Sequence, residues 1–312
     1  MTVTVLNAMI RPLVEPHLPD WVDVRWFSSN EELVELAPEA EIGWLDSFEF
    51  SYTRQGMREG VKLKWLNTIA AGIESFPLDV LKERGVVFTN GAGLNAVPIA
   101  EYVVMGMLVI AKGYREVARS QERKEWLLQP PGTRSLNGTS MLIVGAGGIG
   151  QRVRELLGPW GVSVTEVRRS ASDGALGPDE WRARLGEFDW VLCLVPSSSA
   201  TEAMFGEAEF TAMKQGAAFL NFARGELADQ DALMASLDAG HLGAAFLDVA
   251  VPEPLPADHP LWNYDNVHIS SHLSGRSQET LFRLGAERFL ENLGRWKRGE
   301  PLAATVDYDL GY

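Results

Sequence analysis

The chain has 312 residues, of which 46% are hydrophobic and 22% charged, and its formal net charge at pH 7 is −14. This composition is typical of a globular protein of two ordinary domains, and the negative charge argues against general affinity for nucleic acids or anionic membranes. The single cysteine, Cys193, excludes an intrachain disulfide. The opening stretch 1–6 is too short for a secretory signal, so we expect a cytoplasmic protein.

Short β-rich runs alternate with helix-like segments over the first third of the chain, which predicts a parallel α/β layer. The strand-like runs are 2–6, 22–26, 41–45, 64–67 and 86–89, and the helix-like segments are 31–36 and 77–84. The small residues of Ile69–Ile73 follow a strand and could expose backbone N–H groups to an anion, although a plain tight turn fits the spacing equally well. The loop Trp44–Ser47 ends another strand and could wall the same cleft.

The glycine-rich stretch Asn90–Asn95 leads into a long helical segment, 98–126, and a loop at 129–133. We place the first domain crossover here. The predicted domains are a substrate-binding domain of residues 1–94 plus 276–312 and a dinucleotide-binding domain of residues 95–275. A long helix and arm of this kind are often where dimers form, and we expect a homodimer.

A short apolar run, Met141–Val144, leads directly into Gly145-x-Gly147-x-x-Gly150, and apolar residues at helical spacing follow. The pattern indicates a strand, a tight turn and a helix. Glycines are needed there for the turn, for close approach of backbone to a pyrophosphate, and for packing of helix on strand. The pyrophosphate would lie at the positive end of the helix dipole, against Gly148 and Ile149.

The next strand-like run, 162–167, ends in Arg168-Arg169-Ser170, where an acidic residue would hold the ribose 2′-hydroxyl of NAD. A guanidinium cannot accept a hydrogen bond from a hydroxyl but can bind a 2′-phosphate, so we favour NADP(H), with NAD(H) possible. Alternatively, the two arginines are solvated charges at a strand end, since Glu166 leaves the register ambiguous.

Further strand-like runs at 190–195, 217–221, 243–247 and 267–270 raise the number in this half to six, as in a doubly wound nucleotide-binding sheet. Such sheets bind ligands at the carboxyl ends of their strands. The residues that follow these ends and would shape the nicotinamide side are Pro196, Ser197, Ala223, Asp248, Ser274 and Gly275.

Three residues after strand ends form a candidate catalytic set. Arg224 offers a fork of donors for a carboxylate and a neighbouring carbonyl, His272 can exchange a proton near neutral pH, and Glu253 can stabilise the charged imidazole. Each has an ordinary structural alternative: Arg224 could pair with a nearby carboxylate, His272 could end a strand, and Glu253 could be a solvated loop residue. Their joint placement after a dinucleotide fingerprint favours reduction of a 2-keto acid.

The sequence resembles the D-isomer-specific 2-hydroxyacid dehydrogenase family over nearly its whole length. The motifs that carry the resemblance are Gly145–Gly150, Asn221–Gly225, Asp248–Leu255 and Asn266–Gly275. The resemblance implies two Rossmann-like or flavodoxin-like α/β domains with doubly wound parallel sheets and an active site in the interdomain cleft. It also implies that Arg224, Glu253 and His272 are catalytic, and that the family's usual dimer forms through the nucleotide-binding domain.

The resemblance further implies that the backbone of Ala71, Gly72 and Ile73 binds the substrate carboxylate, beside Arg224, His272 and the loop at Trp44. Arg168 departs from the acidic residue of many members and is similar to the NADPH-preferring glyoxylate and hydroxypyruvate reductases. Glu253, rather than Gln, argues against the formate dehydrogenase branch. We expect no regulatory module after Tyr312, as some phosphoglycerate dehydrogenases carry.

We therefore expect NADP(H)-dependent reduction of a small 2-keto acid, such as glyoxylate or hydroxypyruvate, to the D-2-hydroxyacid. Hydride would pass from the nicotinamide to C2 while His272 acts as general acid. No residues are assigned to a metal. The alternatives are a dehydrogenase for a bulkier D-2-hydroxyacid and a non-catalytic dinucleotide-sensing protein.

Overall fold

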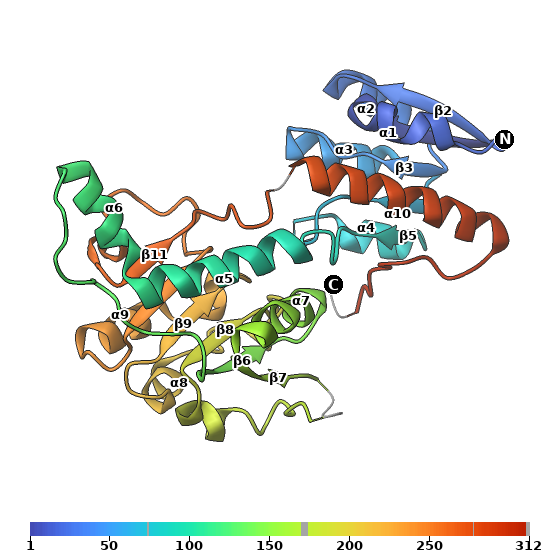
Figure 1. Ribbon diagram of the computed structural model, residues 1–312. Coiled ribbons are helices and arrows are strands. Elements are labelled where there is room, and N and C mark those ends of the chain that lie inside the picture. The colour runs from blue at the N-terminus through green and yellow to red at the C-terminus, as the bar shows by residue number, and fades with distance from the viewer. Residues whose placement is uncertain (74, 170–173, 277, 310–312) are drawn as a thin grey trace. The chain divides into compact units, whose positions relative to one another are not determined.

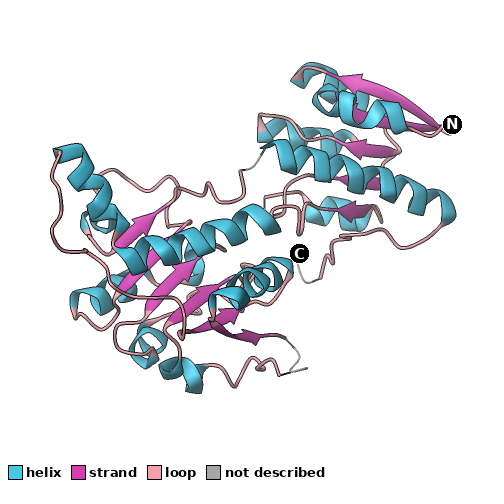
Figure 2. Cartoon of the chain, viewed as in Figure 1, coloured by secondary structure: helices cyan, strands magenta, loops and turns pink. Residues whose placement is uncertain are grey.

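The computed structural model contains two compact units, and each unit is built around one parallel β-sheet (Figure 1, Figure 2). Unit 1 comprises Met1–Asn95 and Ser277–Tyr312, and unit 2 comprises Ala96–Arg276. The structure describes residues 1–73, 75–169, 174–276 and 278–309. Each boundary between the units lies one residue after the position expected from the sequence.

Unit 1 has a five-stranded sheet in the order β2-β1-β3-β4-β5, and all its strand pairs are parallel. Its strands are β1 (Thr2–Asn7), β2 (Val22–Phe27), β3 (Ile42–Trp44), β4 (Trp65–Asn67) and β5 (Val87–Thr89). Its α-helices are α1 (Arg11–Val14), α2 (Asn30–Leu36), α3 (Phe50–Glu59), α4 (Leu78–Glu83) and α10 (Gln278–Arg298). Because side chains alternate along a strand, Val5 faces one buried cluster and Leu6 the other, where Phe289 of α10 packs.

Unit 2 has a six-stranded parallel sheet in the order β11-β10-β9-β8-β6-β7. Its strands are β6 (Ser140–Val144), β7 (Ser163–Val167), β8 (Trp190–Cys193), β9 (Ala218–Asn221), β10 (Ala244–Leu247) and β11 (Val267–Ile269). Its α-helices are α5 (Ala96–Lys112), α6 (Tyr114–Arg123), α7 (Gly148–Leu157), α8 (Glu207–Ala212) and α9 (Gln230–Asp238).

The sheet of unit 2 is buried on both faces, which explains its nearly continuous apolar strands. Leu142 and Val144 of β6 pack into one core, whereas Met141 and Ile143 pack into the other. The chain leaves β6 to form β7 on one side and then β8 on the other. In doubly wound sheets, ligands bind where the strand order reverses in this way, and the glycine-rich loop begins there, at the carboxyl end of β6. The doubly wound fold expected from the sequence is confirmed.

The long helix predicted over 98–126 is wrong in its continuity. It is two helices, α5 and α6, bent by 70° at Gly113, whose φ is 60°. A Cβ at Gly113 would lie 2.8 Å from the carbonyl carbon of Pro131, so the returning loop packs directly on the break. Within the described chain no single helix could span a membrane, and only this bent pair passes jointly by length and composition.

Candidate active site

The glycine-rich loop after β6 is held in a shape that only glycine permits at its first position. Gly145 has a φ of 106°, and a Cβ there would lie 2.7 Å from backbone atoms of Leu194 and Val195. At Gly150, a Cβ would lie 3.1 Å from the Gly145 carbonyl oxygen and 3.2 Å from Ile143. The first and last glycines therefore set the turn and the close packing of α7 on β6.

The two middle glycines leave the start of α7 uncovered. A Cβ at Gly147 or Gly148 would meet nothing within 4 Å, and Gly147 caps α7 without a side-chain hydrogen bond. Ile149 is half-buried beside them. Open space over the N–H groups of a ten-residue helix is the environment that a pyrophosphate requires. These residues fit a dinucleotide.

Arg168, at the end of β7, is not a freely solvated charge. Its Nε and Nη2 atoms lie 3.2 and 2.8 Å from Oε2 of Glu166, which is 6% exposed and also pairs with Arg154 at 3.4 Å. Glu166 therefore anchors the Arg168 guanidinium at the strand end. Arg169 is exposed and has an interaction of its own. Ser170, also expected at this site, lies outside the described residues.

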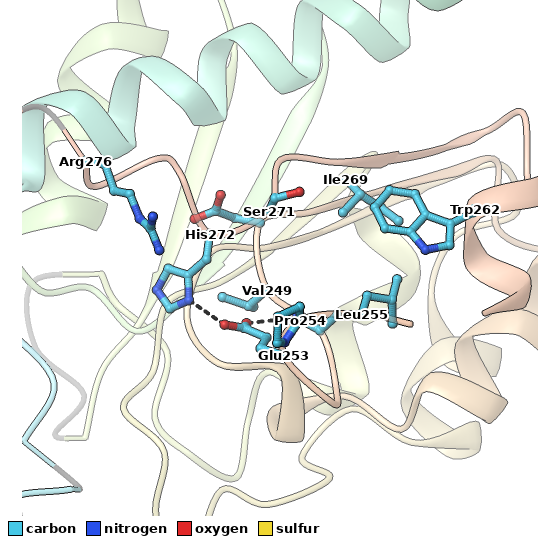
Figure 3. A pocket seen from close by; sticks show the side chains of 11 residues that line it. Val249, Glu253, Pro254, Leu255, Trp262, Ile269, Ser271, His272 and Arg276 are labelled. Atoms are coloured by element: carbon cyan, nitrogen blue, oxygen red, sulfur yellow. Dashed lines mark hydrogen bonds and ion pairs between the residues drawn. The ribbon is translucent and has the colours of Figure 1, made fainter. Parts of the chain in front are cut away.

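His272 and Glu253, which lie 19 residues apart in the chain, meet at the carboxyl edge of the sheet of unit 2. The His272 Nδ1 atom lies 2.8 Å from Oε2 of Glu253, and the other carboxylate oxygen accepts from the Ala250 N–H at 3.1 Å (Figure 3). A carboxylate at Nδ1 orients the imidazole and leaves Nε2 as the atom that can pass a proton to a ligand. Both side chains keep about two fifths of their surface exposed.

Asp248, which follows β10, organises the loop that carries His272. The carboxylate is 3% exposed, and Oδ1 accepts from the Ser270 hydroxyl at 2.6 Å and from the N–H groups of Leu273 and Ser274 at 3.1 and 3.2 Å. The Ser274 hydroxyl donates to Oδ2, and the His272 N–H donates to the Asp248 carbonyl. In between, Ser271 and His272 adopt left-handed φ values of 51° and 56°. Both carboxylate oxygens of Asp248 are thus engaged within the protein.

Arg224 follows β9, the strand next to β10, and its turn is built by Asn221. The Asn221 amide donates to the Arg224 carbonyl at 2.9 Å and accepts from the Ala223 N–H at 3.1 Å. Arg224 is half-buried, and its Nη1 donates to the Ala223 carbonyl at 2.8 Å. A Cβ at Gly225 would lie 2.3 Å from the Ala250 carbonyl oxygen. Arg224 therefore starts from backbone that packs against the loop of Glu253.

A cavity of about 360 Å³ adjoins the His272–Glu253 pair. Its lining residues are Asp248, Val249, Ala250, Glu253, Pro254, Leu255, Trp262, Ile269, Ser271, His272 and Arg276 (Figure 3). Arg224 is not among them. Of the other residues expected on the nicotinamide side, Pro196 is exposed, Gly275 is half-buried, and the Ser197 hydroxyl donates to Glu226 at 3.1 Å.

In unit 1, the turn expected to hold the substrate carboxylate is fastened on both sides. The Asn90 amide donates to the Ala71 carbonyl at 2.9 Å, and a Cβ at Gly91 would lie 2.0 Å from the Ile69 carbonyl oxygen. Within the described part of the chain, the N–H groups of Ala71, Gly72 and Ile73 donate no hydrogen bond. Ile73 has a buried side chain, so its backbone is well fixed.

Trp44 belongs to the core of unit 1, where it is 1% exposed and packs on Phe289, and its edge also lines a small cavity. The indole Nε1 donates to Asp46 at 2.8 Å, and the same carboxyl accepts from the Thr68 hydroxyl and the Ile69 N–H, each at 2.7 Å. Burial raises the pKa of the Asp46 carboxyl against the effect of these three donors. Asp46 thereby ties the end of β3 to the turn at 69–73.

Three roles depend on contacts distant in the chain and were not predicted from the sequence: Asp46 as a link between two strand ends, Asp248 as the organiser of the His272 loop, and Arg276 as a wall of the cavity. The signal for Asp46 and Asp248 was their position directly after a buried strand. For Arg276 the signal was a cation four residues beyond the candidate acid.

A doubly wound sheet with an open glycine-rich loop, and a histidine–carboxylate pair at the ends of other strands of that sheet, define a nicotinamide-dependent oxidoreductase. The sequence profile described as "D-isomer specific 2-hydroxyacid dehydrogenase, NAD binding domain" matches residues 104–274. The chain belongs to the D-isomer specific 2-hydroxyacid dehydrogenase family and is an NAD(P)-dependent oxidoreductase.

Relatives span most of the chain. This chain is 32% identical over 264 residues to an uncharacterized protein in the proB 3′ region of Corynebacterium melassecola, and the match covers 80% of this chain and 84% of that protein. It is 30% identical over 263 residues to glyoxylate reductase/hydroxypyruvate reductase of Homo sapiens, covering 79% and 78%. The crystal structure of a D-isomer specific 2-hydroxyacid dehydrogenase family protein from Aeromonas salmonicida superposes with a TM-score of 0.86 at 27% identity, covering 99% of each chain.

Proposed function

We propose that this protein reduces a small 2-keto acid, of the glyoxylate or hydroxypyruvate type, to the D-2-hydroxyacid with NADPH. The observation that carries the proposal is the His272–Glu253 pair, in which Nδ1 is held at 2.8 Å and Nε2 is left to act on a ligand. The similarity to the human protein named glyoxylate reductase/hydroxypyruvate reductase supports the substrate type.

In the proposed mechanism, protonated His272 gives its Nε2 proton to the oxygen at C2 while charge develops there. Glu253 holds the imidazole in place and stabilises its positive charge through Nδ1. Arg224, in unit 2, is proposed to bind the carboxylate and to polarise the carbonyl. The N–H groups of Ala71 and Gly72, in unit 1, are a proposed anion-binding turn. The nicotinamide, when bound, would supply the hydride to C2.

We propose that Arg168 and Arg169 favour NADP(H). Nε and Nη2 of Arg168 donate hydrogen bonds to Glu166, so Nη1 is the guanidinium nitrogen that remains to bind a 2′-phosphate. Replacing Arg168 by Asp should weaken NADPH binding, measured by fluorescence titration, and leave NADH binding within about threefold. An unchanged ratio of the two affinities would show that the 2′-phosphate lies elsewhere.

We propose a homodimer through unit 2. An open cavity of about 700 Å³ on this unit is lined by apolar side chains of α5, α7 and their neighbours, among them Met105, Leu108 and Trp160. An exposed apolar surface of this kind is typical of a protein interface. Sedimentation should give twice the chain mass, and Met105→Asp should shift the protein toward monomer.

The function is tested by NAD(P)H oxidation on a panel of 2-keto acids with both cofactors. His272→Gln should lower kcat by about 10²- to 10⁴-fold, the usual contribution of general acid catalysis, with little effect on NADPH affinity. The matched control is His241→Gln, because the His241 imidazole bonds to Gln215 and the Met213 carbonyl in another part of unit 2. Turnover confined to bulkier substrates would indicate a dehydrogenase for larger D-2-hydroxyacids, and binding without turnover a dinucleotide sensor.

A further inference from the structure

Arg276 lies four residues after His272 and lines the same cavity. Its guanidinium extends toward the imidazole from the side away from Glu253 (Figure 3). Glu253 occupies Nδ1 of the imidazole, and His272 and Arg276 both line the cavity. A ligand in this cavity therefore meets the Arg276 guanidinium as well as His272.

The charge of Arg276 is not used by any group of the described chain. The residue is exposed, and in the described chain its guanidinium has no carboxylate or carbonyl partner, whereas many other arginines of this acidic chain are paired. The two carboxylates that line the cavity with it are already engaged. Asp248 accepts four hydrogen bonds from the 270–274 loop, and Glu253 binds His272 and the Ala250 N–H.

We propose that Arg276 determines substrate specificity by binding a second negatively charged group, so that among small 2-keto acids the enzyme favours a derivative that carries a second charge over its singly charged counterpart. This inference rests on the proposed function, in which Arg224 holds the carboxylate next to the carbonyl. The second group is a carboxylate or a phosphate at the far end of the substrate. A guanidinium suits both, because its fork of donors matches two oxygens at once.

The test uses two matched substrate pairs that differ in the charge of the distal group. 2-Oxobutyrate is compared with oxaloacetate, and hydroxypyruvate with 3-phosphohydroxypyruvate. We expect kcat/KM to be at least about tenfold higher for one charged member than for its partner. Arg276→Gln should lower the ratio of kcat/KM for the charged member to that for its partner by about 10- to 100-fold, because hydrogen bonds to charged groups contribute roughly 1.5–3 kcal/mol. The change should come mainly from a higher KM for the charged substrate.

Controls separate this role from a general effect. Arg276→Lys should retain part of the preference, and Arg58→Gln, an exposed arginine of α3 in unit 1, should retain all of it. Equal losses for both members of a pair would overturn the proposal, because Arg276 would then hold the common carboxylate. A wild-type protein without preference for either charged substrate would also overturn it.

Failure of the proposed function is distinguished by a binding experiment that needs no turnover. If no 2-keto acid is reduced, calorimetric titration of the NADPH-loaded protein with oxaloacetate and with 3-phosphohydroxypyruvate still measures the anion site. Weaker binding of one of them to Arg276→Gln, with 2-oxobutyrate and hydroxypyruvate unchanged, supports the site. Equal affinity of wild type and variant for both charged compounds refutes it.

Discussion

Replacing Asp248 by Ala should lower kcat by misplacing His272 while the protein stays folded. The carboxylate that is removed accepts hydrogen bonds from Ser270, Leu273 and Ser274, on both sides of the catalytic residue. Ser271 and His272 stand between these donors at φ values of 51° and 56°. A left-handed conformation costs roughly 1–2 kcal/mol per residue, so these bonds oppose about 2–4 kcal/mol of backbone strain.

Without the carboxylate, the loop can release this strain by leaving the conformation that places the imidazole beside Glu253. Each 1.4 kcal/mol corresponds to a factor of about ten in population. The productive conformation should therefore become about 30- to 700-fold rarer, and kcat should fall by the same factor. Dinucleotide affinity should change far less, because both carboxylate oxygens of Asp248 are engaged by the loop.

The assay is steady-state kinetics with titration of NADPH, on variants shown to be folded by circular dichroism. Asp229→Ala is the matched control, because Asp229 caps α9 through the N–H groups of Asp231 and Ala232, and its loss should cost about 1 kcal/mol of stability without affecting kcat. Adding Ser271→Gly to Asp248→Ala should recover part of the activity, since glycine has no left-handed penalty. A loss confined to NADPH affinity, or no rescue by glycine, would refute the reasoning.

Three further predictions concern the dinucleotide loop, acid stability and the thiol. Gly145→Ala should destabilise the protein by about 1–3 kcal/mol, because the φ of Gly145 is 106°. Gly148→Ala should keep the melting temperature but lose dinucleotide binding, because a Cβ there meets nothing within 4 Å. Equal melting temperatures of the two variants would contradict this geometry. Burial lowers the pKa of His268 to about 4 in the folded protein, from 6.5 in the unfolded chain. As the pH falls from about 6.5 to 4, the unfolded chain therefore binds the proton first, and the free energy of unfolding should decrease. His268→Gln should flatten that part of the melting-temperature profile and His17→Gln should not. Burial raises the pKa of Cys193 to about 12, so a thiol reagent should react only as fast as unit 2 unfolds, and rapid labelling of the native protein would disprove this.

The amino-acid sequence was sufficient for the features that depend on local periodicity and spacing. The strands of both sheets lie where apolar runs of strand length predicted them, within two residues at each end. The glycine spacing predicted the turn between β6 and α7, because the constraint at Gly145 arises from backbone only a few residues and one neighbouring strand away. The family resemblance followed from the order of four such local motifs.

Features that depend on distant contacts were decided by the tertiary structure alone. The helical pattern through 98–126 continues in sequence across Gly113, and the bend there depends on Pro131, which returns from the following loop. Likewise, the sequence does not distinguish the two arginines after β7, whereas the structure shows that Arg168 donates a hydrogen bond to Glu166.

The candidate site shows the same division. The sequence predicts that Asp248, Glu253 and His272 follow the ends of strands. Because the carboxyl ends of parallel strands share one edge of a sheet, it also predicts that these residues lie at the same edge. It could not show that the loop of His272 engages both oxygens of the Asp248 carboxylate. Nor could it show that Arg276 lines the same cavity without an ion-pair partner among the described residues. Hydrogen-bond partners are chosen by distance in space, and residues 22 to 26 positions apart become neighbours only when the strands pair.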